Sequence, residues 1–173
     1  MLIMAVPFCI ETTGINPYRD KVLLIGMRVY DGTKLLRLWK ERDEGKMISD
    51  AFDILEQVDD TIVGYNSLLF DVPFLHIRLN VLGRHENQIW EKVYKKKWFD
   101  LHQYLGVGHH SLQYWTYRFK ITEGYSDMTS DGMRVAFEKG EYDKIIRYSI
   151  DHLDAIDGLF NLIMKRRPFQ LKP

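Results

Sequence analysis

The sequence predicts one mixed α/β domain spanning residues 1–173. Two kinds of segment lead to this prediction. Short apolar runs typical of buried strands dominate the first hundred residues, whereas a long segment with helical spacing of apolar residues, 142–164, lies near the end of the chain. Strand-like and helix-like segments also alternate between them, and the length suits a single compact core. We therefore expect a five-stranded mixed sheet flanked by helices.

Five segments have the composition of strands. The first three are residues 1–10, 21–30 and 34–39, and Asp31-Gly32 between the second and third is a strong hairpin signal. These three segments are predicted to form an antiparallel meander. Residues 61–65 are short and rich in β-branched side chains, which predicts a buried central strand, and residues 98–101 predict a fifth strand.

Four segments carry the apolar spacing of helices that cover one face of a sheet. Their expected starts are polar caps, or a proline in the first turn. The predicted helices are residues 51–58 after Ser49-Asp50, a helix with Pro73 in its first turn that runs to residue 82, a helix after Ser111, and residues 142–164.

Composition excludes several classes of protein. The 24 basic and 24 acidic residues balance, so the net charge does not favour avid non-specific binding to a polyanion. A zero net charge is still compatible with a local basic patch. Cys9 is the single cysteine, so no internal disulfide forms and a reducing compartment is the simplest inference. No segment has the form of a signal peptide or a membrane span. We expect a cytoplasmic protein without membrane association.

The first strand ends in a polar motif, Cys9-Ile10-Glu11-Thr12-Thr13-Gly14. Side chains two residues apart on a strand share a face, so Cys9 and Glu11 are predicted to point the same way. Two carboxylates presented in this way can hold two divalent cations side by side, which is a requirement for phosphodiester cleavage by in-line displacement. Here a thiol stands where one of the two carboxylates is needed.

Two later segments place polar side chains beside buried elements. Asn66 and Asp71 follow the predicted central strand, and Asp71 has an alternative role as a cap of the next helix. Tyr148, Asp151 and His152 are three or four residues apart on the last helix and therefore share one face. An amphipathic helix also has such a polar face without any functional site.

In their order and spacing, these three segments resemble the motifs of the DEDD superfamily of 3′–5′ exonucleases, which have the ribonuclease-H-like fold. The resemblance is in particular to the exonuclease domains of family-B DNA polymerases and their free-standing relatives. The first motif of that family, Phe-Asp-Ile-Glu-Thr-Thr-Gly, is matched at six of seven positions by residues 8–14. The second, Asn-x3-Phe-Asp-x-Pro-x-Leu-x2-Arg, is matched throughout from Asn66 to Arg78. In the third, Tyr148 matches and His152 stands where an aspartate is expected.

The resemblance implies a role for each matching residue. Glu11 and Asp71 match metal-binding carboxylates, and Cys9 and His152 fall on the two remaining metal-ligand positions. Tyr148 matches the tyrosine that orients the attacking water. The residues that match contacts to the terminal nucleotides are Thr12, Thr13, Asn66 and Phe70.

The register of the last helix decides which residue takes the third-motif position. Its apolar residues keep their places in the core only if His152 occupies that position, whereas a shift of one residue gives the role to Asp151. A subclass of the family without the tyrosine uses His-x4-Asp, and His152 and Asp157 have that spacing. The sequence around Tyr148 fits the tyrosine subclass better.

Mg²⁺ or Mn²⁺ is the expected cofactor, because the family uses two such ions. A thiol at Cys9 and an imidazole at His152 move the donor set toward softer metals. Three alternatives follow. The enzyme works with a carboxylate borrowed from Asp151 or Asp154, or it is a degenerate exonuclease that still binds nucleic acid, or Cys9 is an introduced change that silences a competent enzyme.

The leading hypothesis is a 3′–5′ exonuclease that hydrolyses phosphodiester bonds at single-stranded DNA or RNA ends by a metal-dependent mechanism. Its expected partners are a single-stranded 3′ end and a polymerase or another replication or repair protein. The alternative is a catalytically degenerate domain that acts as a nucleic-acid-binding or assembly module, and a third hypothesis is a thiol-containing transition-metal site with another hydrolytic role. Residues 90–98, where lysines alternate with aromatics, suit either phosphate contact with base stacking or a solvated loop anchored in the core.

Overall fold

The computed structural model describes residues 5–85, 89–106, 110–121 and 128–165. Its centre is a five-stranded sheet in the order β3-β2-β1-β4-β5. β1 pairs antiparallel with β2 and parallel with β4, so the sheet is mixed, as the sequence predicts. The strands are β1 (Ala5–Thr12), β2 (Val22–Val29), β3 (Gly32–Arg37), β4 (Thr61–Gly64) and β5 (Trp98–Asp100).

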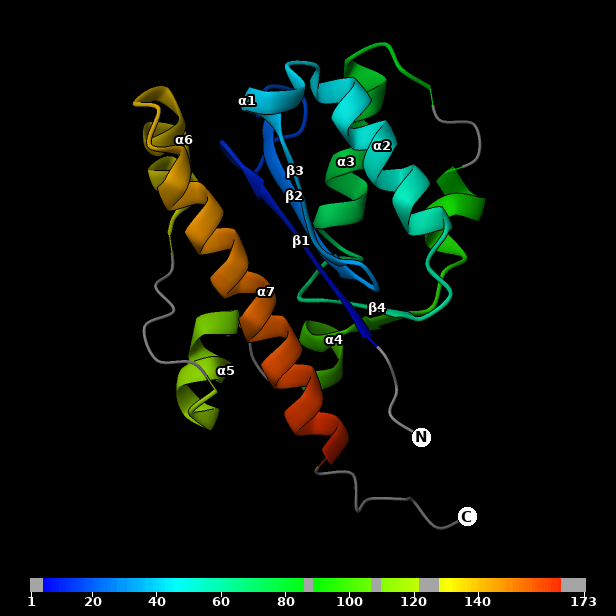
Figure 1. The fold of residues 1–173 in the computed structure, drawn as a ribbon, viewed down its shortest axis with the longest axis vertical. Coiled ribbons are helices and arrows are strands. Elements are labelled where there is room, and N and C mark those ends of the chain that lie inside the picture. The colour runs from blue at the N-terminus through cyan, green and yellow to red at the C-terminus, as the bar shows by residue number, and fades with distance from the viewer. Residues whose placement is uncertain (1–4, 86–88, 107–109, 122–127, 166–173) are drawn as a thin grey trace.

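Helices cover both faces of the sheet. Figure 1 shows α7 along one side of the sheet, with α2 and α3 on the other side. The helices are α1 (Leu38–Glu41), α2 (Glu44–Glu56), α3 (Asp71–Val81), α4 (Leu101–Leu105), α5 (Leu112–Phe119), α6 (Ser130–Glu138) and α7 (Tyr142–Lys165), with a π-helical turn η1 (Trp90–Tyr94). Within the described part of the chain, none of these helices is both long and apolar enough to span a bilayer.

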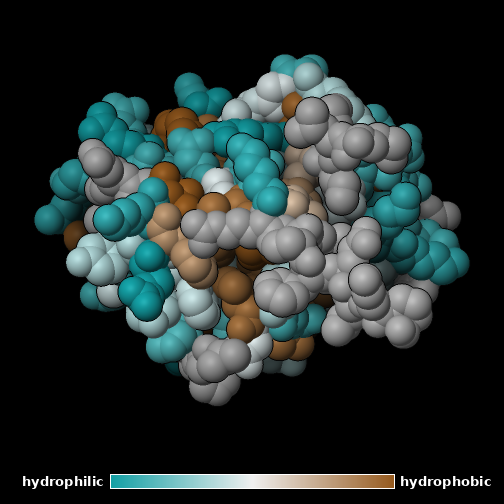
Figure 2. Space-filling model, turned by 90° about the horizontal axis from the view of Figure 1, so that it is seen from below, coloured by the Kyte–Doolittle hydropathy of each residue, from teal (hydrophilic) through white to brown (hydrophobic). Residues whose placement is uncertain are grey.

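The alternation of side chains along β1 divides the core into two layers. Phe8 and Ile10 belong to the apolar cluster under α2 and α3, whereas Cys9 belongs to the cluster under α7. The period of two is that of a strand buried on both faces. Seen from below, hydrophobic side chains gather in the middle of the face (Figure 2).

Two local predictions were wrong. The helix predicted after Ser49-Asp50 begins earlier, at Glu44, because the carboxylate of Asp43 accepts a hydrogen bond from the backbone of Lys46 at 2.8 Å and caps it. The additional turn buries further apolar side chains against the sheet. The hairpin also turns one residue earlier than predicted, since Val29 pairs with Gly32.

Other predicted boundaries are confirmed. Ser111 caps α5 by accepting a hydrogen bond from the Tyr114 backbone at 3.2 Å, and α7 spans the predicted last helix. Asp71 is the first residue of α3 rather than its cap, which is Phe70. Residues 1–4 of the predicted first strand lie outside the described residues.

A buried ion pair joins α2 and α3. Arg78 donates from Nε to Glu44 Oε1 at 2.7 Å and from Nη2 to Glu44 Oε2 at 2.9 Å. Glu44 Oε1 also accepts the backbone N–H of Val22 at 2.8 Å, and Arg78 Nη1 reaches the carbonyl of Pro17 at 3.4 Å. The pair therefore connects two helices to β2 and to the loop that follows β1. Arg78, the last residue of the second motif, therefore has a structural role in this ion pair.

Arg78→Met should lower the free energy of unfolding by about 3–5 kcal/mol, because it leaves the Glu44 carboxylate buried without its partner. Arg84→Met is the matched control. Arg84 pairs with Asp43 in a half-exposed setting, so its loss should cost less than about 1 kcal/mol. Urea denaturation of both variants measures the difference, and equal losses would contradict the assignment.

Candidate active site

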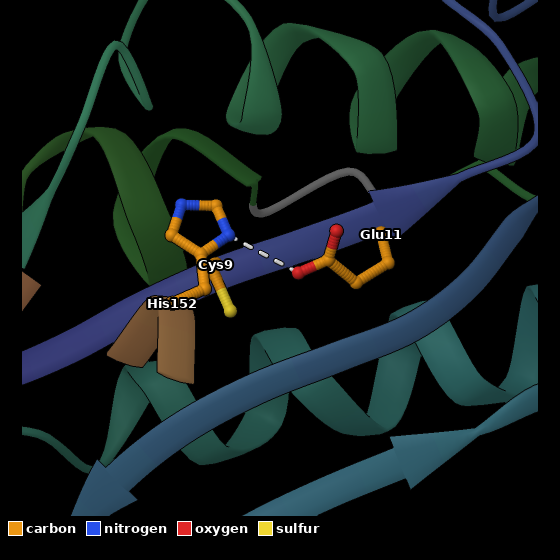
Figure 3. Close-up of side chains that lie close together, drawn as sticks. All are labelled: Cys9, Glu11 and His152. Carbon is orange, nitrogen blue, oxygen red and sulfur yellow. Dashed lines mark hydrogen bonds and ion pairs between the residues drawn. The ribbon is translucent and has the colours of Figure 1, made fainter. Parts of the chain in front are cut away.

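Cys9 and Glu11 point from β1 toward α7, as their spacing predicts. Cys9 is fully buried, and Glu11 is 5% exposed near the end of the strand. The pairing register of β1 with β2 shifts between Glu11 and Thr12, so regular pairing ends at this position. The end of the central strand thus presents a thiol and a carboxylate side by side to the facing helix (Figure 3).

His152 reaches the same place from α7. Its Nδ1 lies 3.1 Å from Glu11 Oε1, and its ring meets the edge of Tyr148 at a centroid distance of 5.9 Å. Leu153, whose side chain is completely buried, follows it directly. Ile156 and Leu159 are completely buried as well. The predicted register of the last helix is therefore confirmed, and His152 faces Glu11.

The donor atoms of Cys9, Glu11 and His152 all lie within 4.8 Å of one another. They come from two elements that are far apart in the chain. Among the residues that the structure describes, no other group of three or more such side chains converges in this way. Asp151, the alternative third-motif residue, does not belong to the group. Three of the four predicted metal ligands are thus brought together.

The fourth predicted ligand, Asp71, lies at the start of α3 and is buried. Desolvation raises the pKa of its carboxyl to about 7. The negative charge of Glu11 adds to this rise, whereas a hydrogen bond from Ser67 Oγ, 2.7 Å from Asp71 Oδ2, and the proximity of His152 oppose it. Asp71 and His152 line the same cleft, and His152 hydrogen-bonds to Glu11.

Cys9 carries its proton at neutral pH. Burial raises the pKa of its thiol well above the ordinary value, and the negative charges of Glu11 and Asp71 raise it further. The sulfur lies 3.9 Å from the backbone carbonyl of Ser149 and donates a weak hydrogen bond to it. The position of the expected bridging aspartate thus holds a neutral side chain.

An open cleft of about 410 Å³ reaches Asp71 and His152, whereas Cys9 and Glu11 do not belong to its lining. Four of its lining residues, Asn66, Phe70, Asp71 and His152, are predicted site residues. Sequence reasoning did not assign His102 and His110 to the site, because histidines in a loop and on a short helix carry no signal of their own. The full lining is Ile10, Tyr65, Asn66, Phe70, Asp71, His102, His110, Ser111, Leu112 and His152.

Asp100 shapes the loop that borders the cleft. Its carboxylate accepts the backbone N–H groups of Asn66 at 2.9 Å and Leu68 at 3.0 Å, and that of His102 at 3.0 Å. Asn66 has φ 62°, a left-handed conformation that asparagine adopts more readily than most residues. Asp100 therefore caps α4 and holds the Asn66 loop.

Thr12 and Thr13 are engaged in the turn after β1. Thr12 Oγ1 donates to the carbonyl of Gly14 at 2.6 Å, and Thr13 Oγ1 accepts the backbone N–H of Lys21 at 2.9 Å. Neither side chain lines the cleft. Their predicted contact with the terminal nucleotide stays a prediction.

Two alternatives that the sequence left open lose support: a substitute metal ligand at Asp154, and phosphate contact with base stacking by residues 90–98. Asp154, one of the carboxylates considered as a substitute ligand, forms an ion pair with Arg28 instead. In residues 90–98, Lys92 pairs with Asp53 at 2.6 Å, and Trp98 packs edge-on against Phe8 at a centroid distance of 5.7 Å. This segment is thus anchored in the core by Trp98, and two of its lysines, Lys92 and Lys95, pair with acidic side chains of the chain.

The family model for the RNase H superfamily matches residues 7–128. The chain belongs to the RNase H superfamily. This membership, together with the sheet order and the flanking helices, confirms the ribonuclease-H-like fold that the sequence motifs predict. Members of the superfamily that act as exonucleases generally use divalent metal ions.

Known polymerases and an exonuclease are similar to this chain. "DNA polymerase 2" of Aeropyrum pernix is 35% identical over 69 residues, which are 39% of this chain and 9% of that protein. The family B DNA polymerase from the hyperthermophilic archaeon Pyrobaculum calidifontis matches with a TM-score of 0.77 at 20% identity, over 92% of this chain and 24% of that chain. Product-bound exonuclease I matches with a TM-score of 0.58 at 13% identity, over 95% of this chain and 44% of that chain. The chain thus spans less than half the length of each relative.

A pair of Mg²⁺ ions does not fit the residues present. Mg²⁺ demands oxygen ligands in near-octahedral geometry. Cys9 offers a protonated sulfur and His152 a nitrogen, which leaves Glu11 and Asp71 as the only carboxylates among the four predicted ligands. The site therefore lacks two of the negative charges that a magnesium pair needs.

Asp71→Asn should make the protein more stable above pH 7. An acid whose folded-state pKa is raised from 3.8 to about 7 destabilises the fold progressively as the pH rises through that interval. In a chelating buffer, the variant should match the parent near pH 4 and exceed it at pH 8. One pKa unit corresponds to about 1.4 kcal/mol, so the gain in free energy of unfolding reaches up to about 4 kcal/mol.

The matched control for this measurement is Asp59→Asn, which changes an exposed aspartate in the same way. Thermal unfolding of the three proteins from pH 4 to pH 8 provides the comparison. Parallel stability curves for the parent and the Asp71→Asn protein would show that the carboxyl is ionised throughout this range.

Proposed function

We propose that this chain is a 3′–5′ exonuclease that removes nucleotides from the ends of single-stranded DNA or RNA. One observation carries the proposal. Asp71 of α3 and His152 of α7 line one cleft together with Asn66 and Phe70, and His152 hydrogen-bonds to Glu11 of β1. The names of similar proteins, two DNA polymerases and exonuclease I, support nucleic acid as the substrate class.

The wall formed by Asn66 and Phe70 is the proposed binding surface for the terminal nucleotides. The ring of Phe70 packs against Phe74 at a centroid distance of 5.5 Å and also borders the cleft. A ring held in this way offers a platform for base stacking, which is worth about 1–3 kcal/mol per base. The Asn66 loop is held by Asp100, and Thr12 and Thr13 stabilise the turn at the end of β1.

Hydrolysis requires a water molecule placed in line with the bond that breaks. Tyr148 is the residue that we propose orients this water, because its ring meets that of His152 at a centroid distance of 5.9 Å. Glu11, and Asp71 once it has lost its proton above about pH 7, supply the negative charge that would attract a divalent cation. Of the two expected cations, we propose that Mn²⁺ supports cleavage better than Mg²⁺, because nitrogen and sulfur occupy two ligand positions.

A second candidate function is a degenerate domain that binds nucleic acid, or assembles with a polymerase or another replication or repair protein, without cleaving. Two observations favour it. The thiol of Cys9 is neutral and buried, and His152 already hydrogen-bonds to Glu11 at 3.1 Å. Two of the four ligand positions thus bring no negative charge. The Cys9→Asp and Glu11→Gln variants separate these two candidate functions.

Cys9→Asp should increase Mg²⁺-dependent release of nucleotides from a single strand labelled at its 5′ end. Position 9 shares a face of β1 with Glu11, so an aspartate restores an oxygen ligand there. Each tenfold gain in rate corresponds to about 1.4 kcal/mol of barrier. The matched control is Cys9→Asn, which has the same shape without the charge and should not gain activity. If the aspartate variant is folded but no faster than the parent, the defect lies elsewhere in the site.

Glu11→Gln should abolish metal-dependent cleavage while affinity for a single-stranded oligonucleotide stays equal or rises. The carboxylate acts on the cation, and its removal relieves repulsion against phosphates. Cleavage and fluorescence anisotropy measured on the same preparation test both parts. Turnover that is insensitive to this change would contradict the exonuclease proposal.

If the parent shows no cleavage, the binding function remains to be tested with Phe70→Ala. Loss of the stacking surface should then weaken oligonucleotide binding by about 1–3 kcal/mol. Phe70 also packs against the core, so the thermal transition of the Phe70→Ala protein must first show that it is folded. Undetectable binding by the parent would contradict both candidate functions.

A further inference from the structure

We propose that Cys9, Glu11 and His152 form a site for one transition-metal ion of the class of Zn²⁺ or Co²⁺. The inference concerns the same site as the proposed function and states which cation it selects. The side chains of Cys9 and His152 do not suit a pair of Mg²⁺ ions. One sulfur, one carboxylate oxygen and one imidazole nitrogen form a donor set of the kind that zinc takes.

The distances between the donor atoms support a single ion. Zinc binds sulfur at about 2.3 Å and nitrogen or oxygen at about 2.0–2.2 Å, so tetrahedral ligands lie roughly 3.3–3.6 Å apart. His152 Nδ1 and Glu11 Oε1 are 3.1 Å apart, and all three donor atoms lie within 4.8 Å of one another. Figure 3 shows the thiol, the carboxylate and the imidazole close together, with the imidazole directed at the carboxylate.

Two of the ligands are held in place by the sheet. Cys9 and Glu11 belong to the central strand, which is paired with β2 on one side and β4 on the other. Gly26 on β2 leaves room for the sulfur, because a Cβ at that position would lie 3.2 Å from Cys9 Sγ. A rigid strand that supplies two ligands and a packed helix that supplies the third preorganise the set.

Charge also favours a doubly charged ion here. Binding replaces the thiol proton of Cys9, which leaves to solvent as the metal–sulfur bond forms. One thiolate and the Glu11 carboxylate then neutralise the ion, and the His152 imidazole binds without a charge. The side chain of His152 is 19% exposed on the cleft, which provides a path for entry. A fourth position facing the cleft stays available for water or a phosphate oxygen.

Titration of the metal-free full chain with Co²⁺ tests the inference. Cys9 is the only cysteine of the chain, so a thiolate-to-cobalt charge-transfer band can arise only from this residue. We expect the band to grow to one ion per chain and to disappear when Zn²⁺ displaces the cobalt. Excess Mg²⁺ should leave the band unchanged.

Variants define the ligand set. Cys9→Ser should abolish the band, and Glu11→Gln and His152→Asn should each weaken Zn²⁺ binding at least tenfold, since even outer-shell partners contribute about 10–100-fold to metal affinity. His85→Asn is the matched control for the imidazole. His85 lies outside the cleft, where it contacts Asn80 at 3.0 Å, so its replacement should change nothing.

Two results would overturn the inference. One is Co²⁺ binding without the charge-transfer band. The other is a band of the parent's strength and affinity in both Glu11→Gln and His152→Asn, which would mean that the thiol binds cobalt by itself. Failure of this metal-site proposal and failure of the exonuclease proposal give different results. A band without nuclease activity leaves the metal site standing, whereas Mg²⁺- or Mn²⁺-dependent cleavage without a band leaves only the nuclease.

Discussion

The central position of β1 is the constraint on which the rest of the structure depends. An antiparallel neighbour and a parallel neighbour pair with its two edges, and helices cover both of its faces. Its strict alternation sends Phe8 and Ile10 under α2 and α3 and sends Cys9 and Glu11 toward α7. A slip of one residue in its register would exchange the core with the site. Fold and site therefore share one determinant.

The site is built so that its carboxylates can be buried close together without a cation. Four acids at the four ligand positions repel one another strongly when no ion is bound. Here Cys9 is neutral, His152 hydrogen-bonds to Glu11, and Asp71 takes up a proton near pH 7. The same replacements that relieve repulsion also remove oxygen ligands for Mg²⁺. The reduced repulsion among the acids and the proposed preference for softer cations thus have one physical cause.

Polar groups outside the ligand positions keep the cleft in shape. The carboxylate of Asp100 holds the loop of Asn66, and the buried pair of Arg78 with Glu44 holds α3, at whose first residue Asp71 lies. Each of these groups binds several partners, so it stabilises a loop or helix rather than a single contact. The geometry around the cleft is therefore as much a property of this supporting network as of the ligands.

Local patterns were sufficient to predict the mixed five-stranded sheet, the three motifs and the register that places His152 opposite Glu11. Alternation along a strand and helical spacing are properties of neighbouring residues, so they can be read from the chain alone. Other features depend on residues distant in sequence. His102 and His110 line the cleft, and Asp154 pairs with Arg28, because the fold brings separate segments together. No local signal marks such contacts, and only the tertiary structure decides them.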